Sequence, residues 1–355
     1  MYYSVVSLEV SQTFSLTLPP CTLAFWHTMK RNTGFLCLAA AVVLSAPLFA
    51  DGIALSRGSG KIDVKINGKL FTSYHFEKVP KPALYPIRWI DGTGMTRRYP
   101  MEKALPGESD DHMHHRSVFW GHRHVKSVKD GGVHDFWGEN SNSGKQVAIE
   151  VTVDKSGVIH ARNKWVSKAG ETIATDSRAI SFSANKNGRI IDYLITIHAS
   201  HGDIVLMDDK DAGMGFRVPD TMCVSPHGTA KVKAEGYMLN SEGVTGAACW
   251  GKRAKWMDYS GRVEGKLLGV AMFDHPDNPR HPTSWHARSY GLCSANIFGK
   301  RHFERLPDKN AGNYTLKKGQ SLTFKHRFYW HSGRGDTKKI EAQYRQWVAA
   351  TGKSS

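Results

Sequence analysis

The chain has 355 residues, of which 40% are hydrophobic and 23% are charged, and its formal net charge at pH 7 is +16. This composition excludes an intrinsically disordered protein and allows one large domain or two medium ones. The lysines are scattered rather than clustered, so we expect no nucleic-acid partner; the charge favours acidic glycans or an anionic cell surface, or serves solubility alone.

The first fifty residues have the pattern of an export signal. Met29-Lys30-Arg31-Asn32 is a short basic segment, residues 35–48 form an apolar run, and Ala50 is a small residue before a cleavage point. We therefore predict that residues 1–50 are an upstream extension plus a signal peptide, with Met29 as the true start. The mature chain, 51–355, is then exported to the periplasm or the cell exterior; an N-terminal anchor is the alternative. No later stretch is apolar enough to span a membrane.

Three cysteines remain after this leader: Cys223, Cys249 and Cys293. An odd number allows at most one internal disulfide and leaves a free thiol. Their spacing matches neither a disulfide scaffold nor a zinc knuckle. We find no cofactor motif in the sequence, so the cofactor stays unassigned.

The elements expected after the leader are mostly strands. Ile62, Val64 and Ile66 alternate with polar residues, and Asn67-Gly68 predicts a hairpin turn into a return strand over 70–74. Prolines punctuate an extended segment at 80–87. Residues 101–117 have a loop-like composition.

Further strands are expected along the middle of the chain, where apolar residues alternate and Gly, Asn and Asp mark the turns. The predicted strands cover residues 147–153, 165–166, 173–175, 178–182 and 189–198, with a hairpin turn at Asn187-Gly188. A helix is expected only near the end, capped by Asp336 and ended by Gly352. Its apolar residues, Ile340, Tyr344, Trp347 and Val348, share one face. These elements predict an all-β protein: one large antiparallel β-sandwich with one C-terminal helix.

A histidine cluster is the strongest functional signal. Six of the 18 histidines fall between positions 112 and 134, in the segment that runs from Asp111-His112-Met113-His114-His115-Arg116 to Asp135-Phe136-Trp137. Histidine titrates near neutral pH, so a cluster of this kind suits proton transfer, metal ligation or the binding of a polar substrate.

Two other segments carry polar groups in suggestive patterns. A glycine-flanked turn holds Asp209-Lys210-Asp211 and leads to Arg217, and acids and a lysine in such a turn fix each other's charge states. If residues 285–292 form a strand, His286, Arg288 and Tyr290 project from one face, which suits a polar cleft with Asn296 nearby.

Taken together, these motifs resemble the exported bacterial proteins often labelled "PmoA family", or methane oxygenase-like, a domain of unknown function. The resemblance covers about residues 60–332 and also includes Tyr85-Pro86, Tyr99-Pro100, Trp250-Gly251 and Asn278-Pro279-Arg280-His281-Pro282. This chain departs from that pattern at Met113, Ser117 and Asp211, where the family usually has proline, glycine and glutamate. The expected sandwich also resembles the galactose-mutarotase-like supersandwich, which implies a carbohydrate role. Methane oxidation is not expected, because the enzyme behind that label is a multi-span membrane protein.

Three functional hypotheses follow. The first is an exported protein that acts on a sugar or uronic acid by acid/base chemistry, as an epimerase, lyase or hydrolase. Its predicted catalytic residues are His115, His286, Asp135, Lys210 and Asp211, and its predicted substrate-binding residues are His114, Arg116, Arg217, Arg288, Tyr290, Asn296 and Trp137. The second is a non-catalytic glycan- or surface-binding protein. The third is a metalloenzyme in which His112 and His114 ligate together with His122 or His286.

Overall fold

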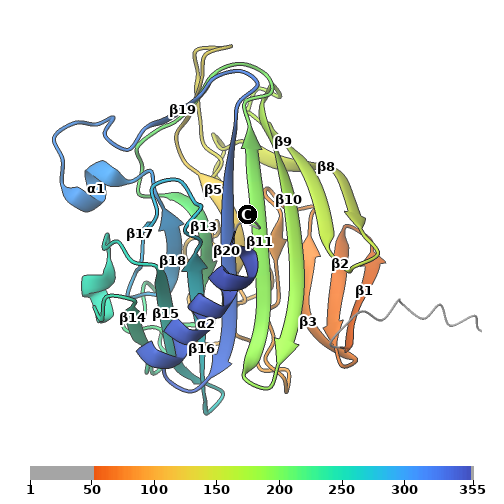
Figure 1. Cartoon of the computed structure of the whole chain (residues 1–355), viewed down its shortest axis with the longest axis vertical. Coiled ribbons are helices and arrows are strands. Elements are labelled where there is room, and N and C mark those ends of the chain that lie inside the picture. The colour runs from red at the N-terminus through yellow and green to blue at the C-terminus, as the bar shows by residue number, and fades with distance from the viewer. Residues whose placement is uncertain (1–51, 353–355) are drawn as a thin grey trace, which may run out of the picture. The chain divides into compact units, whose positions relative to one another are not determined.

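The computed structural model describes residues 52–352, and the predicted leader and its cleavage point lie outside this range. Antiparallel strands dominate the described part of the chain (Figure 1). In spatial order, the first eight-stranded sheet consists of β1 (Ile53–Gly58), β2 (Lys61–Ile66), β3 (Lys69–His75), β4 (Ala83–Leu84), β5 (Val118–His122), β13 (Ala212–Arg217), β18 (Leu292–Asn296) and β17 (Ser284–Trp285).

A second eight-stranded sheet and a small third sheet complete the strands of the described range. The second sheet runs in the order β14 (Tyr237–Asn240), β15 (Trp256–Val263), β16 (Lys266–Asp274), β20 (Ser321–Ser332), β11 (Gly188–His198), β10 (Thr172–Asn185), β9 (Ile159–Val166) and β8 (Lys145–Val153). The third runs in the order β19 (Tyr314–Leu316), β12 (Ile204–Leu206), β6 (Val125–Ser127) and β7 (Val133–His134).

The two large sheets pack face to face through aromatic pairs. Phe71 on β3 meets Phe182 on β10 with ring centroids 6.3 Å apart, and Trp120 on β5 meets Trp165 on β9 at 5.0 Å. These rings belong to one continuous buried cluster that draws on both sheets. The antiparallel β-sandwich predicted from the sequence is therefore confirmed.

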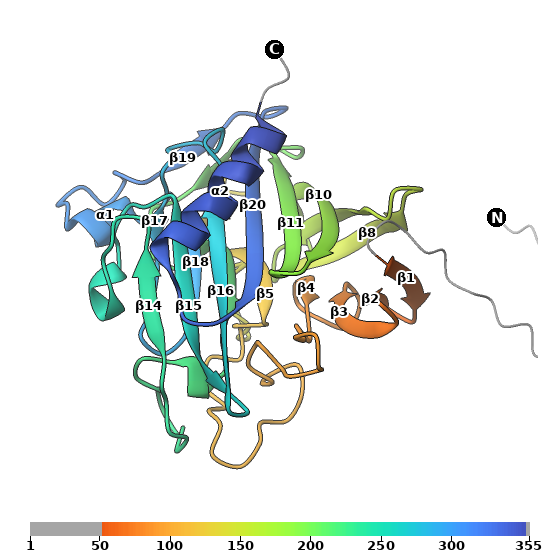
Figure 2. The same ribbon diagram turned by 60° about the horizontal axis from the view of Figure 1, so that its bottom comes forward.

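The C-terminal helix is also confirmed. Helix α2 (Thr337–Thr351) begins after Asp336, whose side chain accepts a hydrogen bond from the backbone N–H of Lys339 at 2.9 Å. Its apolar face packs on the outer face of the second sheet, where it lies across β16 and β20 (Figure 2). Short helical segments that the sequence did not indicate are α1 (Lys300–Glu304) and the 3-10 turns η2 (Asp220–Met222) and η3 (Gly246–Cys249). Neither α-helix in the range 52–352 is long and apolar enough to cross a membrane.

Some predicted strand boundaries need correction. The expected strands at 173–175 and 178–182 are one continuous strand, β10, whose hairpin with β11 turns through Lys186 and Asn187. The expected strand over 285–292 is instead a hairpin, because the chain turns between Arg288 and Gly291. All three cysteines after residue 51 are buried free thiols.

Candidate functional site

A polar cleft with a volume of about 540 Å³ collects side chains from four distant parts of the chain. We call it the imidazole cleft. It lies over the first sheet, and its lining residues are Asp111, His112, Met113, His114, His115, Arg123, Asp135, Trp137, Gly138, Glu139, Asn140, Lys210, Asp211 and Tyr290. Seven of the twelve sequence-predicted site residues are among them: His114, His115, Asp135, Trp137, Lys210, Asp211 and Tyr290.

The floor of the cleft is the outer face of the first sheet. Phe119 forms a small buried cluster with Trp137 and Tyr290, whereas its strand neighbours Val118 and Trp120 belong to the main core. Successive side chains on a strand point to opposite faces, so Phe119 faces away from the sandwich interior. The cleft therefore rests on a rigid β-scaffold rather than on a loop alone.

The loop before β5 delivers the histidines as a stack of rings. The rings of His112 and His115 are parallel, with centroids 4.9 Å apart, and His112 also stacks on Tyr290 at 5.3 Å. His114 meets His115 edge to face at 4.4 Å. Three imidazoles thus share one small volume, as the sequence cluster suggested.

Arg97 anchors this loop to the protein. Its buried guanidinium donates to the carboxylate of Asp111 at 2.6 Å and to the backbone carbonyls of Asp111 and His112 at 2.7 and 3.1 Å. His112 has φ of +44°, a left-handed backbone conformation that side chains with a Cβ rarely adopt. Such conformations persist only where the surroundings impose them, and the contacts of Arg97 do so here.

His115 is held in one protonation state. Burial is the main cause that places its pKa well below the usual value, and the positive charge of Arg217 lowers it further. Arg217 also donates a hydrogen bond to Nδ1 of His115 at 3.3 Å. Because a guanidinium only donates, Nδ1 is the acceptor and the proton of the neutral ring sits on Nε2. In this tautomer Nε2 is a donor, which favours the acid half of the acid/base role expected of His115.

His114 is the better placed base. It is only partly buried, and desolvation, followed by the charge of Lys81, lowers its pKa to about 4. The imidazole is therefore neutral at pH 7 and free to accept a proton in the cleft. The nearby carboxylates of Asp211 and Glu139 act in the opposite direction and raise its pKa, but more weakly.

Asp211 lies between two cations at the other end of the cleft. Nζ of Lys210 contacts both of its carboxylate oxygens at 2.8 and 2.9 Å, and Arg123 donates to Oδ2 at 2.8 Å. Burial raises the pKa of Asp211, but the hydrogen bond and charge of Lys210, helped by His286, outweigh it and the net shift is downward. Gly213 positions this turn, because with φ of +96° a Cβ there would lie 1.9 Å from the carbonyl oxygen of Ala295.

Two other predicted residues line or flank the cleft in structural roles. Asp135 accepts hydrogen bonds from the backbone N–H groups of Trp137 and Gly138 at 2.8 and 2.7 Å, so its carboxylate caps the turn. Arg116, predicted to bind substrate, instead forms a two-pronged ion pair with Glu139 at 2.7 Å and does not line the cleft. Lys81 holds the same carboxylate at 2.9 Å from a fully buried position.

The remaining predicted residues also lie outside the lining. Arg217 is buried beneath it, where it supports His115 and sits 4.7 Å from the ring centre of Tyr290. The side chain of Asn296 is hydrogen-bonded to the backbone: it donates to the carbonyls of Asp209 and Lys210 and accepts from two N–H groups.

His286 and Arg288 depart from the strand prediction because of the hairpin. His286 is buried against Trp250 and Phe303, and burial lowers its pKa to about 3, with Asp211 opposing the shift. Arg288 makes a cation–π contact with Tyr290, with its guanidinium 5.2 Å from the centre of the ring. His115 and His286 therefore do not share the imidazole cleft.

The metal-ligand set considered from the sequence is not assembled. His122 is buried and contacts the carbonyl oxygen of Met207 at 2.9 Å, away from the lining of the cleft. A different trio, Asp111, His112 and His227, brings one ligand atom each within 4.8 Å of the others. His227 gives no signal in the sequence, since it lies 116 residues from Asp111 and only the fold brings it close.

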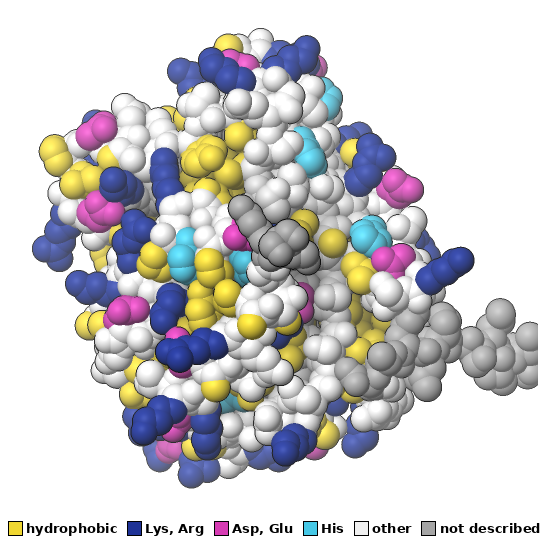
Figure 3. Space-filling view, viewed as in Figure 1, with side chains coloured by type: hydrophobic (Ala, Val, Ile, Leu, Met, Phe, Trp, Pro, Cys, Tyr) yellow, Lys and Arg dark blue, Asp and Glu magenta, His cyan; other side chains and the backbone are white. Residues whose placement is uncertain are grey.

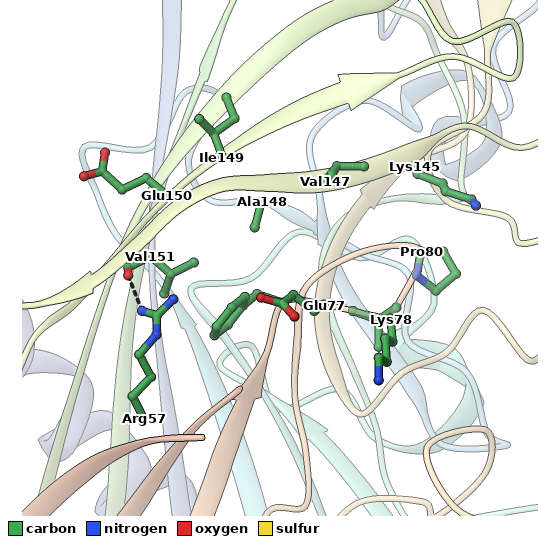
Figure 4. A pocket seen from close by; sticks show the side chains of 12 residues that line it. Arg57, Glu77, Lys78, Pro80, Lys145, Val147, Ala148, Ile149, Glu150 and Val151 are labelled. Carbon is green, nitrogen blue, oxygen red and sulfur yellow. Dashed lines mark hydrogen bonds between the residues drawn. The ribbon is translucent and has the colours of Figure 1, made fainter. Parts of the chain in front are cut away.

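A second groove of about 570 Å³ lies between β8 and the ends of β1 and β3 (Figure 4). Its lining mixes apolar residues, such as Val147 and Ile149, with lysines, glutamates and an arginine, and Arg57 donates across it to the carbonyl oxygen of Val151. None of the residues that line it is a histidine or an aspartate. On the face that Figure 3 shows, basic side chains are dispersed among acidic and neutral ones rather than gathered in one patch. The imidazole cleft is therefore the candidate functional site.

The family model of DUF6807, a family of unknown function, matches residues 61–345, and the chain belongs to this family. No curated protein matches the sequence. The family description names no activity, so the resemblance to the PmoA label stays a prediction.

Solved structures with a similar chain path include three described in carbohydrate terms. The first is a polysaccharide lyase, with 12% identity and a TM-score of 0.35 over 86% of this chain and 35% of the lyase. The second is a galactose mutarotase related enzyme from Lactobacillus acidophilus, with 10% identity and a TM-score of 0.35 over 79% of this chain and 97% of that protein. The third is a galactose mutarotase-like protein from Clostridium acetobutylicum, with 10% identity and a TM-score of 0.37 over 79% of this chain and 95% of that protein. The chain thus spans about a third of the length of that lyase. None of these similarities assigns an activity to this chain.

Proposed function

We propose that this DUF6807 protein is an exported carbohydrate-active protein whose imidazole cleft binds a sugar or uronic acid and transfers a proton on it. One observation carries the proposal: the neutral, partly exposed imidazole of His114 lines the same cleft as the Lys210–Asp211 ion pair. A base and a charged pair in one hollow are what proton abstraction next to a stabilised anion requires.

The remaining groups of the cleft suit a polyhydroxylated ligand. Trp137 borders the cleft with 2% of its surface exposed, and its Nε1–H group is buried without a hydrogen-bond partner in the described range. An unpaired buried donor gains from a ligand oxygen that reaches it. His115 also lines the cleft and carries its proton on Nε2, so it is a second donor there.

An acidic sugar fits this charge pattern better than a neutral one. Beside Asp211, Lys210 and Arg123 place two positive charges against one carboxylate, so this part of the cleft has a cation for a uronate. Two other lining carboxylates have cations of their own, because Asp111 pairs with Arg97, and Glu139 pairs with Arg116 and Lys81. A negative ligand would also raise the pKa of His114 from its low value toward neutrality, where a base is most effective. In the proposed step, a ring nitrogen of His114 takes the proton from the carbon next to the uronate carboxylate, and the electron pair of that C–H bond moves into the carboxylate as an enediolate beside Lys210. The imidazolium then returns a proton, its own or one exchanged with solvent, to that carbon, which restores the neutral imidazole and the carboxylate.

Calorimetry with neutral sugars, uronic acids and oxidised sugars tests binding, and solvent-deuterium exchange or product formation on each binder tests proton transfer. We expect uronic acids to bind most tightly and the exchange to slow at least about tenfold in His114→Gln with binding retained. His160→Gln is the matched control, since His160 is exposed, pairs with Asp154 and is not among the residues that line the cleft. No heat with any sugar class would contradict the proposal.

A second candidate is a non-catalytic glycan-binding protein. It is favoured by the saturation of Asp211, which is already bound by two cations, and by the donor tautomer of His115. The same variant separates the two functions. If wild type binds sugars but shows no exchange or turnover that His114→Gln could abolish, the binding function replaces the catalytic one.

Export rests on the sequence alone. The basic and apolar segments of residues 29–50 support it, and they lie outside the described residues. Fractionation of the native host, with N-terminal sequencing of the mature protein, tests both the location and the cleavage point.

A further inference from the structure

We propose that Asp111, His112 and His227 bind one divalent transition-metal ion at the rim of the imidazole cleft. Metal binding here goes beyond the proposed sugar chemistry and does not depend on it. The three residues come from the loop before β5 and from the loop after η2, so the fold rather than the local sequence assembles the trio.

The ligand atoms converge on one point. Oδ2 of Asp111 lies 2.6 Å from Nδ1 of His227 and 3.2 Å from Nδ1 of His112, and the three residues each bring one ligand atom within 4.8 Å of the others. Ligands about 2.1 Å from a common ion are separated by roughly 3 to 4 Å, so small adjustments would suffice. Two imidazoles and one carboxylate on one side of an ion form a known metal-binding triad with open positions opposite.

His112 supplies an independent sign of a ligand. Its Nδ1 is buried and has no hydrogen-bond partner in the described range, although it points toward the carboxylate of Asp111. A buried unpaired nitrogen is costly, and the left-handed backbone of His112 adds strain. Both costs concern the same residue, and a metal bond to Nδ1 would offset the first of them.

The surroundings fix Asp111 for this role. Arg97 takes its Oδ1 at 2.6 Å, which leaves Oδ2 turned toward the two histidines. Contacts of this kind orient metal-bound carboxylates in proteins. The guanidiniums of Arg97 and Arg217 are balanced by the carboxylates of Asp111 and Asp220, so the ion would enter a locally neutral site.

The donor set selects the class of metal. Imidazole nitrogens favour zinc, cobalt, nickel and iron(II), whereas magnesium and calcium prefer an all-oxygen site. Asp111 and His112 line the cleft, so open positions on the ion could reach a bound hydroxyl or carboxylate; this consequence, unlike metal binding itself, rests on the proposed function.

The test uses the full chain with a histidine-free tag, stripped with a chelator and titrated separately with zinc, cobalt, nickel, magnesium and calcium by calorimetry. We expect one equivalent of zinc, cobalt or nickel, no binding of magnesium or calcium, and a visible absorption band for the cobalt form. His227→Ala should weaken zinc binding more than about 100-fold, because losing even a residue that orients a ligand costs about 10- to 100-fold.

His227 is the decisive position because its side chain is 52% exposed on a loop, so its removal should leave the fold intact. Equal thermal midpoints of the metal-free proteins check this. His160→Ala is the matched control, an exposed histidine paired with one aspartate and no third ligand. Absence of zinc binding, or zinc binding that His227→Ala leaves unchanged, would overturn the proposal. Sugar binding by the metal-free protein, measured in parallel, distinguishes this outcome from failure of the proposed function.

Discussion

Two polar clusters in this protein use similar side chains in opposite ways. Beside the aromatic core, both carboxylate oxygens of Asp176 accept hydrogen bonds, among them those from Asn163 at 2.7 Å, Trp165 at 2.6 Å and Arg178 at 2.8 Å. In the imidazole cleft and beneath it, Nε1 of Trp137 and Nε of Arg217 are buried without a hydrogen-bond partner within residues 52–352, and Nδ1 of His112 has only the 3.2 Å contact with Asp111, which is not a well-formed hydrogen bond.

The difference separates a structural network from a binding site. A buried polar network whose charges are satisfied specifies and rigidifies a fold, whereas unpaired buried groups need a reason such as a ligand. Charge alone would not distinguish the two clusters, since each combines carboxylates with arginine. The number of partners that each polar atom already has is the informative quantity.

The largest expected effect comes from breaking the network around Asp176, whose carboxylate is fully paired although Oδ1 of Asn163 has no partner within residues 52–352. Asp176→Ala leaves the buried guanidinium of Arg178 without its carboxylate, and we expect a loss of about 3–5 kcal/mol in the free energy of unfolding. Chemical denaturation measures it. The matched control is Asp192→Ala, which removes a partly exposed ion pair to Arg327 in the same sheet and should cost less than about 1 kcal/mol. Equal losses in the two variants would contradict the distinction.

Replacing Arg217 should change the tautomer of His115 in the cleft and lower the free energy of unfolding less than Asp176→Ala does. Arg217→Met removes the donor to Nδ1 of His115, so we expect the tautomer of His115 to change and a stability loss of about 2 kcal/mol. Nitrogen NMR of labelled histidine reports the tautomer, and denaturation reports the loss. An unchanged His115 spectrum would mean that Arg217 does not set the tautomer.

The sequence predicted the fold class well because alternation and capping are local signals. The alternation of Ile62, Val64 and Ile66 corresponds to β2, and Asp336 caps α2. Strand β5 had no such signal, because a central strand buried on both faces shows an unbroken run, Val118-Phe119-Trp120-Gly121-His122, instead of alternation.

The site was predictable in its residue types but not in its partners. His114, Trp137 and Asp211 meet in one cleft, as the clustering of polar groups suggested. Arg116 instead pairs with Glu139, and Asn296 is hydrogen-bonded to the backbone of the 208–211 turn. Nothing in the sequence indicates either of these partners. Long-range partners are set by the assembled fold.

Two buried histidines, one without and one with a carboxylate partner, should make stability depend on pH in opposite directions. His286 has its pKa lowered to about 3 by burial, so the unfolded chain binds a proton first and stability falls as pH drops below about 6.5. For His331, burial lowers the pKa, but Asp258 at 2.8 Å outweighs it and the net shift is upward. Its contribution is therefore present at low pH and is lost as pH rises through the folded pKa.

Urea denaturation of variants at pH 5 and pH 8 measures these opposite contributions. His286→Phe should remove up to about 2 kcal/mol of the wild-type loss between pH 8 and pH 5. His331→Gln should be more destabilising at pH 5 than at pH 8. Parallel pH profiles for wild type and both variants would show that pairing does not govern the two histidines.

The smallest expected effect tests the edge of the cleft. Arg123 is 48% exposed and shares Asp211 with Lys210, so Arg123→Gln should change the free energy of unfolding by less than about 1 kcal/mol. Its loss should still weaken the binding of a uronic acid about threefold, because one of two cations beside the ligand is removed, while neutral sugars are unaffected. Arg262→Gln removes a similarly exposed ion pair, with Glu235, away from the cleft and should change neither quantity. A stability loss well above 1 kcal/mol in Arg123→Gln would place Arg123 with the structural network instead of the site.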